Sequence, residues 1–250
     1  MNFSHPVFGP YQPLIATLDL ENGLPALSAL NAQAAVLNIV QAQGRPLRFI
    51  APHGKLAARD YETHILESGT VPTRADTWHD ALNALVWLRY PRFKAALNAA
   101  HVSAMRAETG PARSRRRDAL TMLDESGVWL MGEDRNLYEL IKAHAWQTLF
   151  RQQRQAVQSG LRVVVVGHAL LEKALAPYPA MTGKCLWLGH PADDEATACA
   201  ALPGLDSPHR LAPLPVQGIP GWDAANADPG YYDNADVFRP ARVRVGDTAA

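Results

Sequence analysis

The chain has 250 residues, of which 48% are apolar and 19% are charged, so it is long enough to bury a sizeable core. Its 24 basic and 24 acidic residues cancel, and this gives no whole-protein reason to expect nucleic acid, a membrane surface or an acidic partner. The two cysteines, Cys185 and Cys199, form neither a disulfide framework nor a CxxC pair. They favour a reducing compartment.

The N-terminal segment has no basic start followed by an apolar run, so we expect no signal peptide. No apolar run approaches the roughly 20 residues that a membrane span needs. We therefore expect a cytoplasmic protein with no membrane partner. Residues 1–24 contain three prolines and are expected to wrap the surface.

The first half of the chain predicts a mixture of helices and short strands. Residues 24–44 are rich in Ala and Leu at helical spacing and predict a helix capped by Gly44. Residues 47–52 predict a short strand, and residues 61–74 a strand, a turn and an extended segment. Residues 77–101 predict two apolar helices separated by a short break before Pro91.

The second half continues this mixture. "GPARSRRR" (110–117) is a basic connection, and residues 118–132 predict a β-hairpin with Glu125, Ser126 and Gly127 at the turn. The remaining expected elements are a long helix over 136–160, a strand buried on both faces over 161–167, a short helix over 168–176 and a strand over 184–189.

Residues 203–240 are rich in Pro, Gly, Asn and Asp, but they also carry several aromatic residues. Aromatic residues at that density argue against disorder, so we expect an irregular arm that packs on a core spanning about residues 24–200. Helices and strands do not alternate regularly and no repeat is present. The sequence therefore predicts one α+β domain over residues 1–250, with a central αα-hairpin, a β-hairpin and a few buried strands.

The helical pair carries the main candidate site. His79 and Asn83 share one face of the first helix, and Lys94, Asn98 and His101 share one face of the second. In an antiparallel hairpin these two polar stripes would meet. Buried polar groups without partners cost roughly 1–3 kcal/mol each, so they would bond one another, a ligand or a metal. The alternative is a purely structural network, and no standard metal motif is present.

Other groups add to this site or stand as alternatives to it. The arginines of the basic connection predict an anion site, since guanidinium groups bind phosphate or carboxylate bidentately, or else a solvated loop. Asp118 and Asp124 are candidates for acid–base work or cation binding, although carboxylates near a turn often only form the turn. His168 opens a helix after a strand, where backbone N–H groups can hold an anion, and Glu172 is placed to bond it.

Several motifs together indicate a family. "PHGKLAARDYETHI", "GTVPTRADTWHDALNALVWLRYPRFKAALNAAH", "RRRDALTMLDESGV", "GHALLEKAL", "MTGK", "LPVQGIPGW" and "YYDNADVFRP" resemble a proteobacterial domain-of-unknown-function family, numbered three-zero-two-five. The resemblance spans about residues 45 to 240. It implies one bacterial, cytoplasmic domain, and it implies no activity, cofactor or catalytic residue.

The leading hypothesis is a hydrolase, with metal assistance, that acts on a phosphate-containing or otherwise anionic small substrate. The expected catalytic residues are His79, Asp80, Asn83, His101 and Asp118. The expected anion-binding residues are Lys94, Asn98, Arg115, Arg116, Arg117 and His168. A divalent metal would use His79, His101 or Asp124.

Two alternatives remain open. One is a non-catalytic module that binds RNA or a protein through the Arg113–Arg117 run, and the other is a protein whose polar network is only structural. An enzyme predicts that the histidines and arginines converge in a concave pocket. A binding module predicts arginines on an open face, and a structural network predicts sealed, fully bonded side chains.

Overall fold

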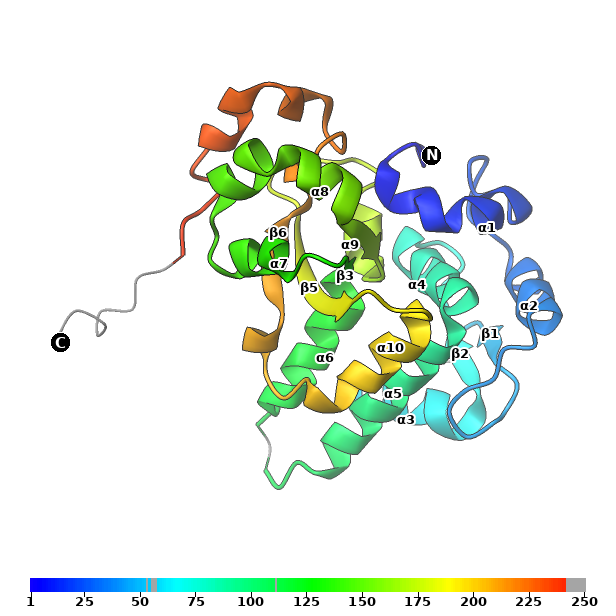
Figure 1. Ribbon diagram of the computed structural model, residues 1–250. Helices are drawn as coiled ribbons and strands as arrows, with labels where there is room; N and C mark the ends of the chain where they lie inside the picture. The colour runs from blue at the N-terminus through cyan, green and yellow to red at the C-terminus, as the bar shows by residue number, and fades with distance from the viewer. Residues whose placement is uncertain (53, 55–57, 111, 242–250) are drawn as a thin grey trace.

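The computed structural model describes all residues except 53, 55–57, 111 and 242–250 (Figure 1). The α-helices are α1 (Gln12–Thr17), α2 (Leu27–Val36), α3 (Ala58–Ser68), α4 (Trp78–Arg89), α5 (Pro91–Arg106), α6 (Arg115–Ser126), α7 (Arg135–Lys142), α8 (Arg154–Gly160), α9 (His168–Lys173) and α10 (Asp194–Ala201). The strands are β1 (Arg48–Ile50), β2 (Thr70–Pro72), β3 (Gly127–Met131), β4 (Arg162–Val165), β5 (Thr182–Gly189) and β6 (Ala212–Pro215). The expected α+β class is confirmed.

The larger of the two sheets has four strands in the order β4-β3-β5-β6 and is mixed parallel and antiparallel. β3 runs antiparallel to β4 and parallel to β5, and β5 runs antiparallel to β6. The strand that is buried along its whole length is β3. The expectation that residues 161–167 are buried on both faces is wrong for the start of β4, an edge strand on which Arg162 is exposed.

The β-hairpin expected over residues 118–132 is wrong. Residues 115–126 form α6, and only residues 127–131 form a strand. Ser114 caps the helix by accepting a hydrogen bond from the Arg117 backbone N–H, and Ala119, Leu120 and Leu123 are buried on one side of it. Helix capping and helical apolar spacing therefore outweigh the β-like run that follows.

The strand expected over residues 61–68 is also wrong, because this segment belongs to α3. Ile65 and Leu66 of α3 are buried. Gly69 follows the helix with φ 75°, and its N–H bonds the Ile65 carbonyl. A left-handed glycine after the last turn is a common helix stop. The extended segment that follows is β2, which pairs in parallel with β1 to form a separate two-stranded sheet.

Two further helix boundaries differ from expectation because non-glycine residues end the helices. The chain leaves α2 at Asn38 (φ 50°) rather than at Gly44, and it leaves α7 at His144 (φ 53°). Asn and His are among the residues that tolerate left-handed backbone best. The segment 136–160 is thus divided into α7, the π turn η2 (Thr148–Gln152) and α8.

The N-terminal segment contributes to the core and does not merely wrap the surface. The 3₁₀ helix η1 (Pro6–Tyr11) and α1 bury Phe8, Tyr11 and Ile15 in the main hydrophobic cluster. The Tyr11 hydroxyl donates to the Val165 carbonyl at 2.7 Å, at the end of β4. The expectation of a peripheral segment is therefore wrong for these residues.

The C-terminal arm packs on the core as expected, over α7 and α8 at one end of the molecule (Figure 1). Tyr232 and Phe238 pack on Phe150, with ring centroids 5.4 and 6.1 Å from it. The arm also supplies β6 to the central sheet, and its remaining turns are η4 (Pro208–Arg210), η5 (Val216–Gly218), η6 (Ala224–Ala227) and η7 (Pro229–Asp233). The turn η3 (Leu202–Gly204) precedes them.

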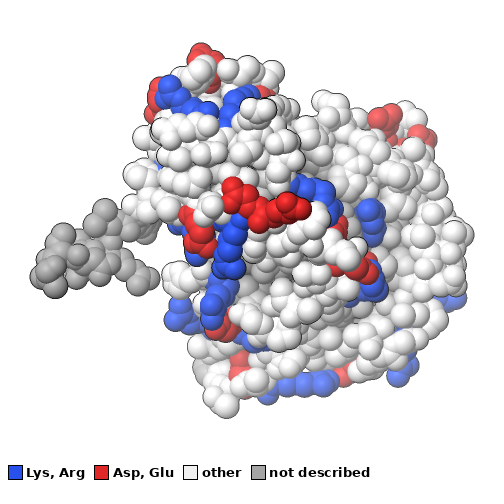
Figure 2. Space-filling view, viewed as in Figure 1, with Lys and Arg blue, Asp and Glu red and all other residues white. Residues whose placement is uncertain are grey.

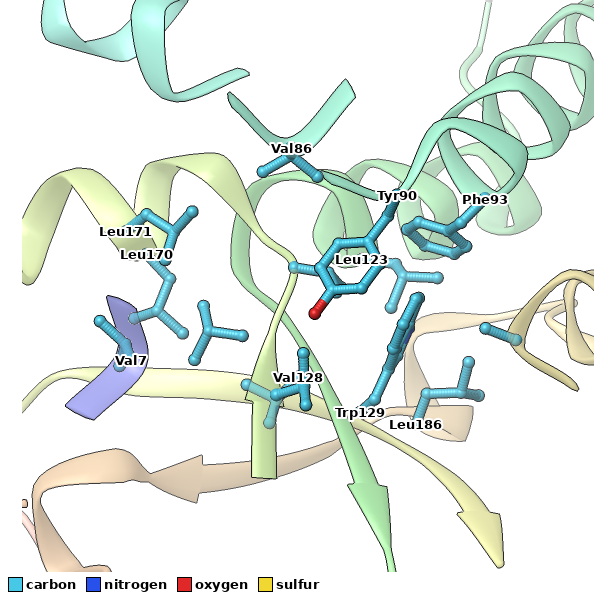
Figure 3. Packing of buried hydrophobic residues seen from close by; sticks show 14 of the residues in the cluster. Val7, Val86, Tyr90, Phe93, Leu123, Val128, Trp129, Leu170, Leu171 and Leu186 are labelled. Carbon is cyan, nitrogen blue, oxygen red and sulfur yellow. The ribbon is translucent and has the colours of Figure 1, made fainter. Parts of the chain in front are cut away.

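The two central helices α4 and α5 are separated by a single residue, Tyr90. Tyr90 and Phe93 lie against Trp129 of β3, each with its ring centroid 4.9 Å from the indole (Figure 3). This contact fixes the start of α5 on the sheet. From there α5 packs most extensively on α3, and α4 on α9. The polar faces of α4 and α5 therefore meet groups from α3, α6 and α9.

Candidate functional site

Helices α3, α4, α5, α6 and α9 surround a pocket of about 630 Å³. Its lining is dominated by titratable and polar side chains. The described lining residues are Pro52, Gly54, Tyr61, Glu62, Pro72, Arg74, His79, Asp80, Asn83, His101, Arg113, Arg117, Thr121, Asp124, Glu125 and His168. Such a concentration of ionisable groups in a concave site is typical of catalytic and ligand-binding centres. His53 and Lys55 of "PHGKLAARDYETHI" lie outside the described residues.

Two glycines bring the end of α6 against the start of α9. A Cβ on Gly167 would lie 2.3 Å from the Gly127 backbone nitrogen, and one on Gly127 would lie 2.1 Å from the Leu123 carbonyl oxygen. The Gly127 carbonyl accepts bonds from the N–H groups of both Val166 and Gly167 at 2.9 Å. The absence of a side chain at Gly167 permits this approach, which places His168 beside the carboxylates at the end of α6, whereas at Gly127 it lets the chain leave α6 close to Leu123.

A first cluster joins His79, Glu125 and His168. The Nε2 atoms of the two histidines lie 3.1 Å apart, and His168 Nε2 lies 3.6 Å from Glu125 Oε2. The other ring nitrogen of His79, Nδ1, is 2.8 Å from Glu172 Oε2. Glu172 thus bonds His79, and the bond expected between Glu172 and His168 does not form.

The protonation of this cluster is constrained by its carboxylates. A carboxylate accepts hydrogen bonds, so Glu172 places the His79 proton on Nδ1 and leaves a lone pair on Nε2. His168 Nδ1 is buried without a hydrogen-bond partner among the described residues, 3.8 Å from Asp124 Oδ1. With its proton on Nε2, a neutral His168 donates to the lone pair of His79 Nε2, as the 3.1 Å separation allows. In the other tautomer of His168 both Nε2 lone pairs face each other and are available to a cation.

A second cluster joins Glu62, His101 and Asp124, whose ligand atoms all lie within 4.8 Å of one another. Lys94 forms an ion pair with Asp124 Oδ1. Asn98 donates to Glu62 Oε2 at 2.6 Å. His101 Nε2 is buried and has no partner among the described residues.

Burial raises the pKa values of the two glutamates and lowers those of the two histidines, whereas nearby positive charge lowers that of Asp124. Burial, with the nearby Asp124 charge, raises the pKa of Glu62 to about 7. Burial lowers the pKa values of both His101 and His168 to about 4. Burial alone would raise the pKa of Asp124, but the Lys94 charge and the two nearby imidazoles outweigh it and lower that pKa to about 2. Burial also raises the pKa of Glu125.

Three arginines line the pocket, each already held by a carboxylate. Arg74 donates to both oxygens of Asp80, at 2.8 and 3.0 Å. Arg117 pairs with Glu108 at 3.0 Å, and Arg113 pairs with Asp118 at 2.8 Å. Burial alone would raise the pKa of Asp80, but the bonds from Arg74 outweigh it and lower that pKa. Asp80 therefore stays ionised and fixes Arg74 beside the pocket.

The expected site residues divide into three groups. Those lining the pocket are His79, Asp80, Asn83, His101, Arg117, Asp124 and His168. Lys94 and Asn98 line a small enclosed gap next to it, together with Asn83, His101 and Asp124. The residues absent from the described lining are Asp118, Arg115 and Arg116.

The basic run is divided among different partners. Arg115 is exposed, Arg116 donates to the Pro203 carbonyl, and Arg117 turns into the pocket. On the face shown in Figure 2, basic and acidic side chains are interspersed. The side chains of the run therefore do not all face solvent together.

The polar stripes of α4 and α5 meet in part, because Asn83 lines the same small gap as Lys94, Asn98 and His101. Among the described residues no hydrogen bond joins the two polar stripes. Asn83 donates to the Tyr61 hydroxyl at 3.2 Å, and Asn98 donates to the Glu62 carbonyl oxygen at 2.9 Å. Both asparagines thus bond α3, the helix on which α5 packs, and not each other.

Sequence reasoning missed several residues of the pocket. The expected strand gives Glu62 no role at the site, and Glu125 is expected, with Asp124, either to form the turn or to bind a cation or act in acid–base work. The sequence singles out neither Tyr61 nor Arg74. Correct assignment of α3 as a helix would have placed Tyr61 and Glu62 on its inner side, next to buried Ile65 and Leu66. No local pattern marks Arg74, whose role depends on its contact with Asp80.

The family described as "Protein of unknown function (DUF3025)" matches residues 47–242. The chain belongs to this family. The match covers α3 to α10 and the C-terminal arm, and so includes every described residue of the pocket. No curated protein and no solved structure matches the chain. Within the described residues, no helix combines the length and the apolar character needed to cross a membrane.

Proposed function

We propose that this member of the DUF3025 family is a metal-dependent hydrolase that acts on a small phosphate-containing or otherwise anionic substrate. The observation that carries the proposal is the pair of Nε2 atoms of His79 and His168, 3.1 Å apart at the wall of the pocket. Ligand atoms on a tetrahedral zinc ion at roughly 2.0–2.1 Å are separated by about 3.3 Å. The histidine pair therefore has nearly the spacing of two ligands on one ion.

Glu125 completes the set of ligands. Its Oε2 lies 3.6 Å from His168 Nε2, within a small movement of the same spacing. Two histidines and one carboxylate are a set found in catalytic zinc sites, and the same set binds iron in other enzymes. Glu172, bonded to the far nitrogen of His79, supplies the outer support that orients a ligating imidazole. A bound ion of this kind acidifies a water molecule and polarises a phosphoryl oxygen.

The arginines support the anionic character of the substrate. Arg74, Arg113 and Arg117 line the same pocket as the histidine pair. A guanidinium carries five N–H donors, so pairing with one carboxylate leaves donors for a phosphate or carboxylate of the substrate. Their carboxylate partners keep these side chains in place before substrate binds.

The pocket also has a charge balance that suits a bound cation. Its described lining includes three arginines but four carboxyl groups, those of Glu62, Asp80, Asp124 and Glu125. A divalent ion beside Glu125 would reverse the excess of negative charge and allow an anion to enter. This supports a site in which the ion and the arginines hold the substrate together.

The test is metal analysis combined with assay of simple phosphate esters. Protein incubated with Zn²⁺ or Mn²⁺ and then dialysed is compared with His79→Ala, and with His209→Ala as a control, since His209 is exposed and absent from the described lining. We expect wild type and His209→Ala to retain metal and to hydrolyse 4-nitrophenyl phosphate or bis(4-nitrophenyl) phosphate. We expect folded His79→Ala to retain less metal than wild type and to lose the hydrolysis. Equal metal retention by His79→Ala and wild type would overturn the proposal.

A further inference from the structure

We propose that Glu62, His101 and Asp124 form a second cation site, so that the pocket holds a two-cation centre rather than a single ion. This inference rests on the proposed function, since both sites open on the same pocket. It adds a distinct set of ligands, which come from α3, α5 and α6. The first site uses side chains of α4, α6 and α9.

The spacing of the second set is close to that of ligands on one ion. Its three ligand atoms lie within 4.8 Å of one another. Opposite ligands on an octahedral ion at roughly 2.1 Å are about 4.2 Å apart. Side-chain movements of less than about 1 Å would therefore bring all three onto one ion.

His101 supplies the independent evidence for a ligand. Its side chain is buried, with 4% of the residue exposed, and Nε2 has no partner among the described residues. A buried polar atom without a partner is costly, so native structures rarely leave one without a bound species to satisfy it. The imidazole faces the two carboxyl groups of its cluster.

The neighbouring amides offer further oxygen ligands. An enclosed gap of about 10 Å³ is lined by Glu62, His101, Asp124 and the two asparagines Asn83 and Asn98. The Oδ1 atoms of both asparagines are buried and unpartnered among the described residues. The gap has room for one small species. Lys94 also lines it but is paired with Asp124, and the carboxyl, amide and imidazole groups of the lining offer acceptor atoms, which favours a cation.

Lys94 does not displace this ion. It bonds Asp124 Oδ1, and a carboxylate has a second oxygen for a metal. With Glu125 the two sites contain three carboxylates against one lysine, so the region retains negative charge for two cations. Asp124 and Glu125 are consecutive, and each faces one of the two clusters.

Two adjacent cations define the substrate class more narrowly. In two-metal sites the ions stabilise both the attacking and the leaving oxygen of a displacement at phosphorus. We therefore assign phosphate esters as the substrates of this pocket, in preference to carboxylate-containing substrates. The three arginines would hold the remaining phosphate oxygens.

The experiment counts Mn²⁺ ions bound per chain by equilibrium dialysis and records the electron paramagnetic resonance spectrum of the loaded protein. The variants are Glu62→Gln, His101→Ala, His79→Ala and the control His209→Ala. Glu62→Gln preserves side-chain volume and an oxygen that accepts the Asn98 bond, so it tests the site even if His101→Ala fails to fold.

We expect two ions and a spin-coupled spectrum in wild type and in His209→Ala. We expect one ion and an uncoupled spectrum in Glu62→Gln, and the same in His79→Ala. One ion in wild type, lost in His79→Ala and kept in Glu62→Gln, would overturn the second site and leave the proposed function standing. No bound ion in wild type would overturn both, and two ions in Glu62→Gln would overturn the assignment of the second site to this cluster.

Discussion

The Nε2 atoms of His79 and His168 lie 3.1 Å apart although the residues are 89 positions apart in the chain. Their rings meet edge to face, with centroids 4.6 Å apart and an interplanar angle of 74°. The packing of α4 on α9 creates this contact, and Glu172 of α9 reaches back to the far nitrogen of His79. The same helix pair therefore supplies both imidazoles of the proposed metal site and the group that orients one of them.

Replacement of Glu172 by glutamine should weaken metal binding by roughly 10–100-fold. A glutamine amide can donate to Nδ1, and it would then move the His79 proton to Nε2, the atom that would bind the ion. Isothermal titration with Zn²⁺ measures the change. Glu139→Gln serves as the control because Glu139 pairs with Arg135 and Lys142 on the surface. Equal affinity in wild type and Glu172→Gln would contradict this role.

Gly167→Ala should destabilise the protein by about 1–3 kcal/mol and disturb the histidine pair. The added methyl group would lie 2.3 Å from the Gly127 nitrogen, so the start of α9 must move away from the end of α6. Urea unfolding measures the loss. Gly160→Ala is the matched control, since no atom lies within 4 Å of its added methyl group. A Gly167→Ala protein as stable as Gly160→Ala would show that the contact yields without cost.

The metal-free protein should lose stability as the pH falls from 6.5 towards 4. The pKa values of His101 and His168 are lowered from 6.5 to about 4, so in this range the unfolded chain binds more protons than the folded one. Glu62 acts in the opposite sense, because its pKa is raised from 4.5 to about 7 and its contribution is lost as the pH rises through 7. The raised pKa of Glu125 acts in the same sense as that of Glu62, whereas the lowered pKa values of Asp80 and Asp124 add to acid lability at the lower end of the range. The imidazoles titrate across the whole range, and we expect acid lability as the net effect.

Glu62→Gln removes the opposing contribution and so tests the sign of this balance. The variant should lose stability more steeply than wild type between pH 6.5 and 4.5, because Glu62 then no longer opposes the contribution of the imidazoles. Chemical unfolding at a series of pH values in the presence of a chelator gives both slopes. A shallower slope in Glu62→Gln would be inconsistent with a raised pKa for Glu62.

Tyr11→Phe should cost about 1–3 kcal/mol of unfolding free energy, since it removes the donor to the buried Val165 carbonyl. The measurement is thermal or urea unfolding. Tyr178→Phe is the control, because Tyr178 is 43% exposed and lies far along the chain from this contact. Indistinguishable stabilities for the two variants would mean that η1 is only loosely attached to β4.

Arg113→Gln should raise KM for a phosphate ester by roughly tenfold or more, because a hydrogen bond to a charged group contributes about 1.5–3 kcal/mol. Arg115→Gln should leave KM unchanged, since Arg115 is exposed and absent from the described lining of the pocket. Steady-state kinetics with both variants make the comparison. A similar rise in KM for the two would indicate long-range charge rather than contact with substrate.

Local signals predicted the central helices well. Thr77 caps α4 by accepting a bond from the Asp80 N–H, and Pro91 opens α5, as their positions in the sequence indicate. The errors at α3 and α6 have one cause. Both helices have few apolar residues, and a short strand follows each of them closely. The apolar residues of the strand therefore dominate the local pattern, and the pattern predicts a strand where the helix lies.

The residues of the pocket were harder to predict than the helices that carry them. His79 and His101 attract attention because polar residues recur at helical spacing on apolar helices. Their neighbours come from distant segments: Glu172 lies 93 positions from His79, and Glu62 lies 36 positions from Asn98. Only the packing of α3 on α5 and of α4 on α9 brings these groups together, and helical spacing carries no information about that packing.

The hydrophobic core includes an N-terminal segment that lies outside the region matched by the family. The family match begins at residue 47, whereas Phe8, Tyr11 and Ile15 belong to the same hydrophobic cluster as Trp129. A protein shortened to the matched region would expose the surfaces of β4 and α4 that η1 and α1 now cover. We therefore expect the shortened protein to aggregate, and studies of the pocket should keep the first 46 residues attached.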